Sequence, residues 1–424
     1  MSMLATEAAR PQVSVVLPCL NEAGSVALVV REALEAIGAA GYTGEVVIGD
    51  NGSTDGSQAI AEAAGARVVH QPIRGYGAAL AAGINAARGV IVVMADADNT
   101  YPFEFLGRLV APVLADEVDM MIGARWSGAT AHTMPFLHRF VGTPVLTWLV
   151  RRAGGPAGLT DSQSGFRAFR RDRLLDLHLR STGMDYASEM FIVAGRQDWR
   201  IREIPAGYRE RIGESKLDTL ADGWRHLKTI VLLAPDLLAT YPGAAAFLAG
   251  VLMLGFSFLN RGAFAIGSLG WLGSLLGPVF IIIGVQAVLA GVVIGVASPL
   301  RRHSRTERFL TDEEVLRSAA IGGLWLVGVA LVLDLTLFLS WALRLGAPFV
   351  GLPLAGLAQA MLLIGLTLIW YGVIASILLA GSRRWGAGDA PSTADAVMPR
   401  RSADAVLPVP IDAWDSTASP AAGS

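Results

Sequence analysis

The sequence places two carboxylates, Asp96 and Asp98, one residue apart, directly after an apolar run over 90–95. Two closely spaced carboxylates offer the hard oxygen ligands that Mg²⁺ and Mn²⁺ prefer. Mg²⁺ held by so few protein ligands normally bridges to substrate phosphates. The alternative is structural, because Asp98 and Asn99 suit a turn and a cap for the helix after Pro102. The pair alone leaves both interpretations open.

The acid pair belongs to an alternating pattern in which short β-rich runs are followed by Ala-rich helical stretches. Such alternation predicts an α/β fold, with a mostly parallel sheet covered by helices on both faces and ligands at the carboxyl ends of the strands. The predicted strands are Val13–Leu17, Glu45–Gly49, Arg67–His70, Val90–Ala95 and Met120–Gly123, and the predicted helices lie near 24–40, 56–65, 76–88 and 102–115.

Polar clusters follow three of the predicted strands. They are the segments 18–22 (PCLNE), 50–56 (DNGSTDG) and 96–102 (DADNTYP). Because parallel strands end at a common edge, we expect the three clusters to converge on one rim of the sheet. No G-x-G-x-x-G follows the first strand and no G-x-x-x-x-G-K-S/T occurs, so the dinucleotide oxidoreductase and P-loop classes lose their main support.

Composition excludes further classes. The chain has 34 basic and 36 acidic side chains, a formal charge of −2, so it is no nucleic-acid binder driven by bulk charge. A single cysteine, Cys19, excludes an intramolecular disulfide and a pair of metal-ligating thiols, and we expect it to be a core side chain. The N-terminal residues lack a basic stretch followed by an apolar one, which predicts no cleaved secretory signal.

Long uncharged stretches in the second half predict a transmembrane region. Charges are absent from 237–260, 262–300 and 345–382, and Asp334 is the one charge within 318–343. Each stretch exceeds the roughly 20 residues that cross a bilayer. Buried helices of a soluble core are the alternative, but such helices seldom lack a polar face. The predicted spans are Tyr241–Leu259, Leu275–Ala297, Ala319–Leu343 and Leu357–Ala380, and the glycine-rich start of 262–300 leaves room for a re-entrant segment.

The basic residues predict how the spans are oriented. Arg301, Arg302, Arg305 and Arg308 follow the second span, and Arg383 and Arg384 follow the fourth, whereas each of the other two loops holds one arginine. By the positive-inside rule, both termini and the first domain lie in the cytoplasm. An acid within a span is costly, so we expect Asp334 to pair with another span or with a neighbour in a homo-oligomer.

Taken together, the clusters resemble the nucleotide-sugar domain of family 2 glycosyltransferases, which has the GT-A fold. The longer series is similar to the polyprenyl-phosphate hexose synthases, the dolichyl-phosphate mannose or glucose synthase group, over about residues 12–230. This resemblance implies transfer of mannose or glucose from GDP-mannose or UDP-glucose to polyprenyl phosphate, with Mg²⁺ or Mn²⁺ as cofactor. The matching segments are LPCLNEAGSV, GDNGSTDGS, RGYGAAL, MADADNTYP, GARW, DSQSGFRAFRR, GMDYASEM and YRERIGESKL.

The resemblance also implies donor-binding residues. The first-strand segment contacts the nucleotide, Asp50 lies near its base and ribose, and the 96–98 segment holds the diphosphate and the metal. Thr100 stands where many members have glutamine, which leaves a third metal ligand unassigned. The implied donor residues are Pro18, Leu20, Glu22, Asp50, Asp96, Ala97, Asp98, Arg125, Arg211 and Lys216, of which Asp96 and Asp98 are the metal ligands.

A reaction that joins two phosphate-bearing substrates needs cations, although each arginine alone also suits a solvated surface. By resemblance, the acceptor phosphate is bound by Arg209, Arg211, Ser215, Gln163 and Ser164, and the catalytic residues are Asp98, Asp161 and Arg125. Asp161 is either a base, a group that orients the lipid phosphate, or an N-cap of a following helix. No base is required, because a phosphate monoester with a second pKa of about 6 is already largely dianionic, so we expect direct displacement with inversion.

Arginines beside the apolar run 136–150 predict helices at the membrane surface: Arg151, Arg152, Arg170, Arg171 and Arg173. An amphipathic core helix with a solvated basic face is the alternative. Trp224 marks the approach to the first span. The predicted organisation is an N-terminal arm (1–11), a GT-A domain (12–220), an interfacial linker helix (221–240), a transmembrane domain of about four helices (241–381) and a disordered tail (382–424).

Two other functions fit parts of the sequence. A processive polysaccharide synthase also joins a GT-A domain to membrane helices, but no Q-x-x-R-W motif occurs and all spans follow the first domain. A non-catalytic carrier or flippase partner of lipid-linked sugar would not need Asp96 and Asp98. The preference for Arg over Lys and the lack of a eukaryotic targeting signal favour a multi-pass protein of a prokaryotic plasma membrane.

Overall fold

A computed structural model of the protein describes residues 10–127, 138–213, 219–259, 269–297, 309–343 and 351–386. Within these ranges, its first part is built on a seven-stranded sheet of order β3-β2-β1-β4-β6-β5-β7, in which only β6 runs antiparallel to its neighbours. The predicted mostly parallel sheet is confirmed. The strands are β1 (Val13–Cys19), β2 (Gly44–Asp50), β3 (Arg67–His70), β4 (Ile91–Met94), β5 (Met120–Ala124), β6 (Arg167–Arg170) and β7 (Ile201–Pro205).

Strands β6 and β7 were not predicted, and their sequences explain why. The four residues of β6 include two arginines, and β7 has two adjacent charged residues, Arg202 and Glu203, between its isoleucines. Neither segment has the apolar run that marks β1 or β4. Because β6 inserts between β4 and β5, the segment after Asp161 continues into a strand, which removes the alternative that Asp161 caps a helix.

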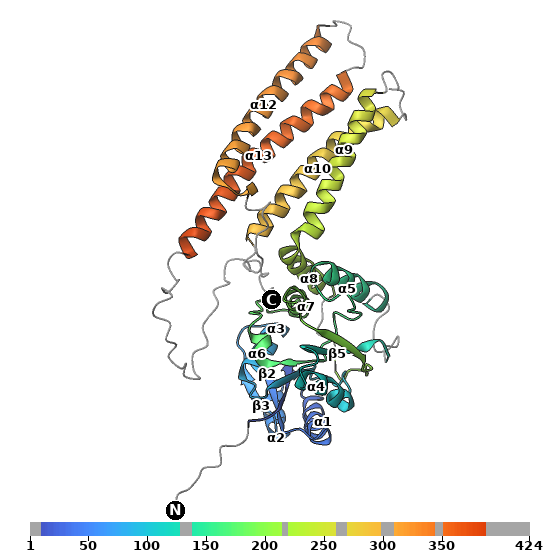
Figure 1. Ribbon diagram of the computed structural model, residues 1–424, viewed down its shortest axis with the longest axis vertical. Coiled ribbons are helices and arrows are strands. Elements are labelled where there is room, and N and C mark those ends of the chain that lie inside the picture. The colour runs from blue at the N-terminus through green and yellow to red at the C-terminus, as the bar shows by residue number, and fades with distance from the viewer. Residues whose placement is uncertain are drawn as a thin grey trace, which may run out of the picture. The chain divides into compact units, whose positions relative to one another are not determined.

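Helices cover both faces of the sheet (Figure 1). A hydrophobic core lies on each face of the sheet, and alternate residues of β1 point into one or the other. Val15 and Leu17 belong to the core beneath α1 and α4, whereas Val16 belongs to the core beneath α3 and α7. The helices of this part are α1 (Val26–Ala39), α2 (Ser57–Ala63), α3 (Tyr76–Ala86), α4 (Leu106–Leu114), α5 (Thr143–Arg152), α6 (Arg171–Leu175), α7 (Tyr186–Arg196) and α8 (Thr219–Leu233), with single turns η1 (Phe103–Phe105), η2 (Arg125–Ser127), η3 (His138–Gly142) and η4 (Asp236–Thr240).

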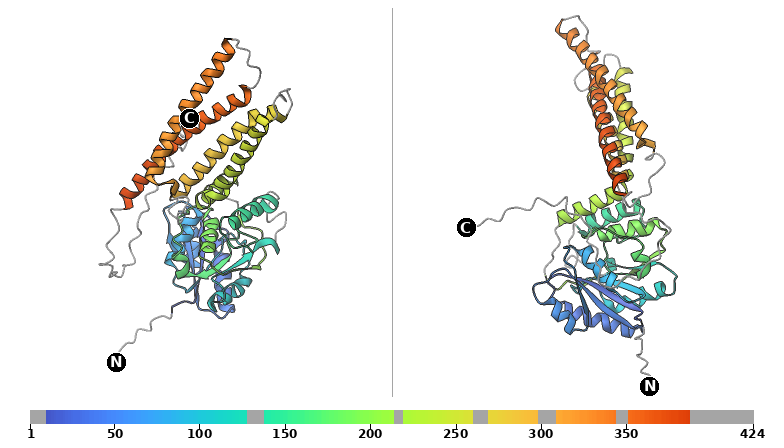
Figure 2. Two further views of the ribbon diagram at one scale, coloured as in Figure 1. Left: turned by 45° about the horizontal axis from the view of Figure 1, so that its top comes forward. Right: turned by 90° about the vertical axis from the view of Figure 1, so that its left-hand side faces the viewer.

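Four helices in the described second half are long and apolar enough to cross a membrane, and each contains or overlaps a predicted span. They are α9 (Tyr241–Leu259), α10 (Leu269–Ala297), α12 (Glu313–Ala342) and α13 (Gly351–Gly386). Figure 2 shows α9 beside α10 and α12 beside α13. The expected re-entrant segment falls partly on 260–268, outside the described residues, as are the N-terminal residues 1–9. The expected disordered tail, 382–424, was placed too early at its start, because α13 continues to Gly386; its remainder, 387–424, lies outside the described residues.

Polar side chains connect these spans. Gln359 of α13 donates to Asp334 Oδ2 of α12 at 2.9 Å, and Gln286 of α10 donates to Thr367 Oγ1 of α13 at 3.4 Å. The expected pairing of Asp334 with another span is therefore confirmed. Bonds between helices satisfy polar groups that hydrocarbon cannot solvate.

Candidate active site

Hydrogen bonds hold the three predicted polar clusters together at the carboxyl edge of the sheet. The Asn21 backbone N–H donates to Ser53 Oγ at 2.9 Å, and the Ser25 hydroxyl donates to the Ala97 carbonyl at 2.8 Å. The strand register explains this convergence, because Cys19 at the end of β1 lies opposite Asp50 at the end of β2. The segments 18–22, 50–56 and 96–102 thus form one rim, as predicted, and bring Pro18, Leu20, Glu22 and Ala97 to it.

Asp50 is fully buried and shapes its own loop. Its carboxylate accepts the Gly52 backbone N–H at 3.0 Å and the side-chain amide of Gln58. Burial alone would raise the pKa of Asp50, but hydrogen bonds from Ser53 and Gln58 outweigh it and hold the pKa below its usual value. Asp50 is therefore an ionised acceptor beneath the rim.

Asp96 and Asp98 lie close enough to repel each other. Burial, together with the charge of Asp98, raises the pKa of Asp96 to about 7. The Tyr76 hydroxyl donates to Asp96 Oδ1 at 2.9 Å. On Asp98, Oδ1 accepts the Thr100 hydroxyl at 2.6 Å and Oδ2 pairs with Arg211 Nη2 at 2.8 Å. Thr100 thus supports Asp98 within a turn.

This donor set fits a divalent cation. A carboxylate pair whose repulsion suppresses ionisation is stabilised by added positive charge, and carboxylate oxygens suit Mg²⁺ and Mn²⁺. No group of three or more His, Cys, Asp or Glu side chains suited to a metal occurs among the described residues. Asp96 and Asp98 would therefore supply the protein's share of the ligands, with the rest from water or substrate. The helix that follows has Pro102 as its N-cap, so Asp98 does not cap it.

Arg125 and Asp161 form a buried two-pronged ion pair. Arg125 Nε and Nη2 each donate to one carboxylate oxygen of Asp161 at 2.8 Å, and the Arg125 backbone N–H adds a third bond at 3.1 Å. Burial would raise the pKa of Asp161, but the Arg125 charge lowers it below its usual value. The guanidinium also lies over the Tyr208 ring, 5.4 Å from its centroid. Asp161 therefore holds Arg125 beside the acid pair.

The segment 161–165 approaches the acid pair from the side of β6. A Cβ placed on Gly165 would lie 3.0 Å from the Tyr76 hydroxyl and 3.3 Å from Asp96 Oδ2, so the backbone passes directly over the carboxylate. The Ser164 hydroxyl is buried and donates to the Gly123 carbonyl at 2.6 Å. Gln163 is partly exposed, and its amide donates to Ser162 Oγ at 3.0 Å.

The residues between 209 and 216 that were expected to bind donor or acceptor phosphate divide into three groups. Arg211 lies with Asp98, as described above. Arg209 instead donates to both carboxylate oxygens of Glu32 on α1, at 2.8 and 3.0 Å, so its side chain is held apart from the acid pair. Ser215 and Lys216 lie outside the described residues.

Several residues of the site carried no recognised role in the sequence. Tyr76 lies within the RGYGAAL segment, but only the structure shows it bonded to Asp96. Glu203 of β7 accepts the backbone N–H groups of Thr160 and Asp161, at 2.8 and 3.1 Å. Arg167 is fully buried and donates to the carbonyls of Ser162 and Ser164. The partners of Tyr76 and Glu203 lie 20 and more than 40 residues away in the sequence, so local spacing gave no signal for these two residues.

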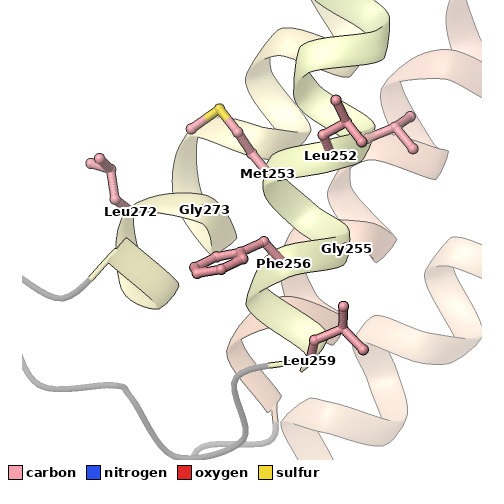
Figure 3. A pocket seen from close by; sticks show the side chains of 8 residues that line it. Leu252, Met253, Gly255, Phe256, Leu259, Leu272 and Gly273 are labelled. Atoms are coloured by element: carbon pink, nitrogen blue, oxygen red, sulfur yellow. The ribbon is translucent and has the colours of Figure 1, made fainter.

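One cavity among the described residues lies in a different part of the molecule. A cavity of about 770 Å³ lies between α9 and α10, lined by Met253, Phe256, Leu272 and neighbouring apolar residues (Figure 3). None of its lining residues comes from the rim. The candidate site is therefore defined by its charged groups and not by this cavity.

Comparison of the sequence with known proteins identifies a family. The sequence profile of glycosyl transferase family 2 matches residues 14–176. The low-salt glycan biosynthesis hexosyltransferase Agl6 of Haloferax volcanii is 37% identical over 323 residues, 75% of this chain and 77% of that protein. The dolichyl-phosphate hexose transferase of the same organism is 38% identical over 188 residues, 44% of this chain and 79% of that protein.

A solved structure of glucosyl-3-phosphoglycerate synthase from Mycobacterium tuberculosis, bound to Mn²⁺, uridine diphosphate and glucosyl-3-phosphoglycerate, aligns with a TM-score of 0.42 and 27% identity. The alignment covers 54% of this chain and 81% of that one. The mixed sheet and its acidic rim define a GT-A domain followed by candidate membrane helices. The chain belongs to glycosyl transferase family 2.

Proposed function

We propose that the protein transfers a hexose, mannose or glucose, from a nucleotide sugar to polyprenyl phosphate. The observation that carries this proposal is the juxtaposition of the Asp96–Asp98 pair with Arg125 and Arg211, in a chain that also holds four candidate membrane spans. Acids that hold a cation and arginines that bind phosphate suit a nucleoside diphosphate donor, and the spans suit a lipid acceptor. The Haloferax relatives named as hexosyl- and dolichyl-phosphate hexose transferases support this assignment.

On the donor side, Asp96 and Asp98 would hold Mg²⁺ or Mn²⁺, which when bound neutralises charge on the departing nucleoside diphosphate. Arg125 is pre-oriented by Asp161 and needs no rearrangement to present its charge. Arg211 pairs with Asp98 and can exchange that partner for a phosphate oxygen. Together with Asp50 and the segment 18–22, these residues make up the donor site.

On the acceptor side, the chain has no need to remove a proton. The oxygen of a largely dianionic phosphate monoester is already a nucleophile, since its second pKa is about 6. Asp161 suits an orienting role better than that of a base, because both its oxygens accept bonds from Arg125. Displacement in line, with inversion at the anomeric carbon, then depends on positioning and charge neutralisation.

One surface suits attachment to the membrane beside the acceptor. Val145 and Trp148 on α5 are half exposed, and Arg152 lies 5.7 Å from the Trp148 ring centroid. Apolar side chains beside arginines favour the headgroup region of an anionic bilayer. Arg171 and Arg173, grouped with this surface from the sequence, lie elsewhere: Arg171 donates to the Ile84 and Asn85 carbonyls, and Arg173 pairs with Asp119. We place the GT-A domain on the cytoplasmic side of a prokaryotic plasma membrane.

The direct test is transfer of label from a panel of GDP- and UDP-sugars into organic-extractable lipid, with purified protein, undecaprenyl phosphate and Mg²⁺ or Mn²⁺. We expect one donor to give labelled lipid that EDTA abolishes. Asp98→Asn is the variant that tests the metal site. It keeps the side-chain shape but removes the charge opposite Arg211, and we expect it to lose most turnover. Absence of transfer from every donor with folded protein contradicts the proposal, and activity retained in Asp98→Asn contradicts the metal site.

A further inference from the structure

A tyrosine hydroxyl occupies one oxygen of the acid pair. Tyr76, the first residue of α3, donates its hydroxyl to Asp96 Oδ1 at 2.9 Å. The other oxygen, Oδ2, accepts no hydrogen bond from the residues that the structure describes. It lies against the backbone of Gly165, where a Cβ would be 3.3 Å away. Within the described part of the chain, Asp96 therefore has one oxygen engaged and one oxygen left for a ligand.

Glycines on either side of Tyr76 fix its position. A Cβ on Gly75 would lie 2.2 Å from the Thr182 carbonyl oxygen, and that same oxygen accepts the Ala78 backbone N–H at 2.9 Å. A Cβ on Gly77 would lie 2.6 Å from a carbonyl oxygen of the same loop. Because only glycine allows this close approach, the first turn of α3 is locked against the loop and the Tyr76 ring is held beneath the acid pair. This packing accounts for the glycines of the RGYGAAL segment.

A carboxylate with one bonded oxygen presents the other in a fixed direction. Side chains that hydrogen-bond to metal ligands orient those ligands, and their loss typically weakens metal binding by about 10- to 100-fold. Mg²⁺ demands near-octahedral geometry, whereas Ca²⁺ has flexible geometry and binds carboxylates through one oxygen or both. An Asp96 that offers a single oriented oxygen therefore suits Mg²⁺ better than Ca²⁺.

We propose that Tyr76 is a positioning residue that bonds one oxygen of Asp96, so that the other alone meets the cation and Mg²⁺ is preferred over Ca²⁺. This inference rests on the proposed function, in which Asp96 and Asp98 hold the cation. Tyr76 acts only through Asp96, and its role is to orient a ligand and to restrict how that ligand binds.

The test measures cation binding to the full-length protein. Tyr76→Phe keeps the ring and its packing but removes the hydroxyl. Tyr371→Phe is the matched control, because it removes a hydroxyl on α13 that also donates at 2.9 Å, in this case to the Leu310 carbonyl. Binding of Mn²⁺ is followed by electron paramagnetic resonance, first with the metal alone and then with GDP or UDP added. Mg²⁺ and Ca²⁺ are each titrated to displace the bound Mn²⁺.

We expect Tyr76→Phe to weaken binding of Mn²⁺ and Mg²⁺ by about tenfold and binding of Ca²⁺ by less, and Tyr371→Phe to match wild type. Unchanged Mn²⁺ binding in Tyr76→Phe overturns the positioning role, and so does an equal loss for all three ions, which damage to the fold alone would produce. Wild-type protein that binds no Mn²⁺ under any of these conditions also overturns it.

The lipid-transfer assay separates this role from the proposed function. Wild-type protein that shows the expected cation binding but transfers no sugar to lipid overturns the proposed function and keeps the role of Tyr76 at the cation site. Wild-type protein that transfers sugar, with cation preference unchanged in Tyr76→Phe, keeps the proposed function and overturns the role of Tyr76.

Discussion

At the scale of single residues, the site depends on charges that are buried together. Arg125 and Asp161 come from loops 36 residues apart and lie almost wholly out of water. A buried ion pair adds little stability compared with apolar residues of the same shape, but removal of one partner leaves an uncompensated charge. The pair is therefore better explained by the need for a fixed cation beside Asp96 than by stability.

This explanation predicts a separation of stability from activity. Asp161→Asn should lower the free energy of unfolding by about 3–5 kcal/mol and remove most turnover, because Arg125 loses a charged partner. The double variant Arg125→Met, Asp161→Leu should regain much of that stability but remain inactive. Thermal unfolding and lipid transfer measure the two properties. Glu117→Gln, which breaks an exposed pair with Arg202, is the control and should behave like wild type. A stable and active Asp161→Asn contradicts the role of the pair.

The sequence identified the residues whose type and position after a strand already restrict their chemistry. Asp50, Asp96 and Asp98 follow apolar strands, so their convergence could be predicted from the edge of a parallel sheet. The partners of these acids could not be predicted. Tyr76 meets Asp96, and Arg209 turns to Glu32, through tertiary contacts that no local pattern encodes.

Helices and strands show the same difference between features that a local sequence pattern predicts and features that depend on tertiary contacts. Each of the four candidate membrane helices overlaps a predicted span, and α9 has the predicted bounds, because a long uncharged apolar stretch is visible in the sequence itself. Strand β6 was missed because it is short, and its buried Arg167 interrupts the apolar pattern. Arg167 is tolerated there because its guanidinium donates hydrogen bonds to backbone carbonyl groups and stacks on Phe191, 4.0 Å from the ring centroid.

Close packing of α12 on α13 gives a prediction at this scale. A Cβ on Gly323 would lie 2.5 Å from the Gly365 carbonyl oxygen, whereas a Cβ on the adjacent Gly322 would meet nothing within 4 Å. Gly323→Leu should therefore force the helices apart and destabilise them by about 1–3 kcal/mol, the usual effect of overpacking. Gly322→Leu should be close to neutral. Unfolding in SDS titration, followed by tryptophan fluorescence, compares the two, and equal midpoints would show that the helices are not in close contact here.

At the scale of the whole molecule, charge separates two environments. Residues 1–260 hold 49 of the 70 charged side chains, whereas residues 261–424 hold 21 although they include most of the spans. The arginines after the second and fourth spans predict that the GT-A domain and both termini share the cytoplasmic side. A nucleotide-sugar donor is found in the cytosol of a prokaryote, so this orientation is also the one that the proposed reaction requires.

The orientation of the chain in the membrane can be tested with cysteine labelling, because we expect the native cysteine not to react with the label. Cys19 is 2% exposed, and burial raises the pKa of its thiol to about 11, so little thiolate is present to react near neutral pH. Glu62→Cys places a thiol on the exposed side of α2, and Ala347→Cys places one between the third and fourth spans. With a membrane-impermeant maleimide, Ala347→Cys should react in intact spheroplasts and Glu62→Cys only after permeabilisation. The reverse pattern would place the acid rim outside the cell, away from any cytosolic nucleotide sugar, and would contradict both the orientation and the proposed donor.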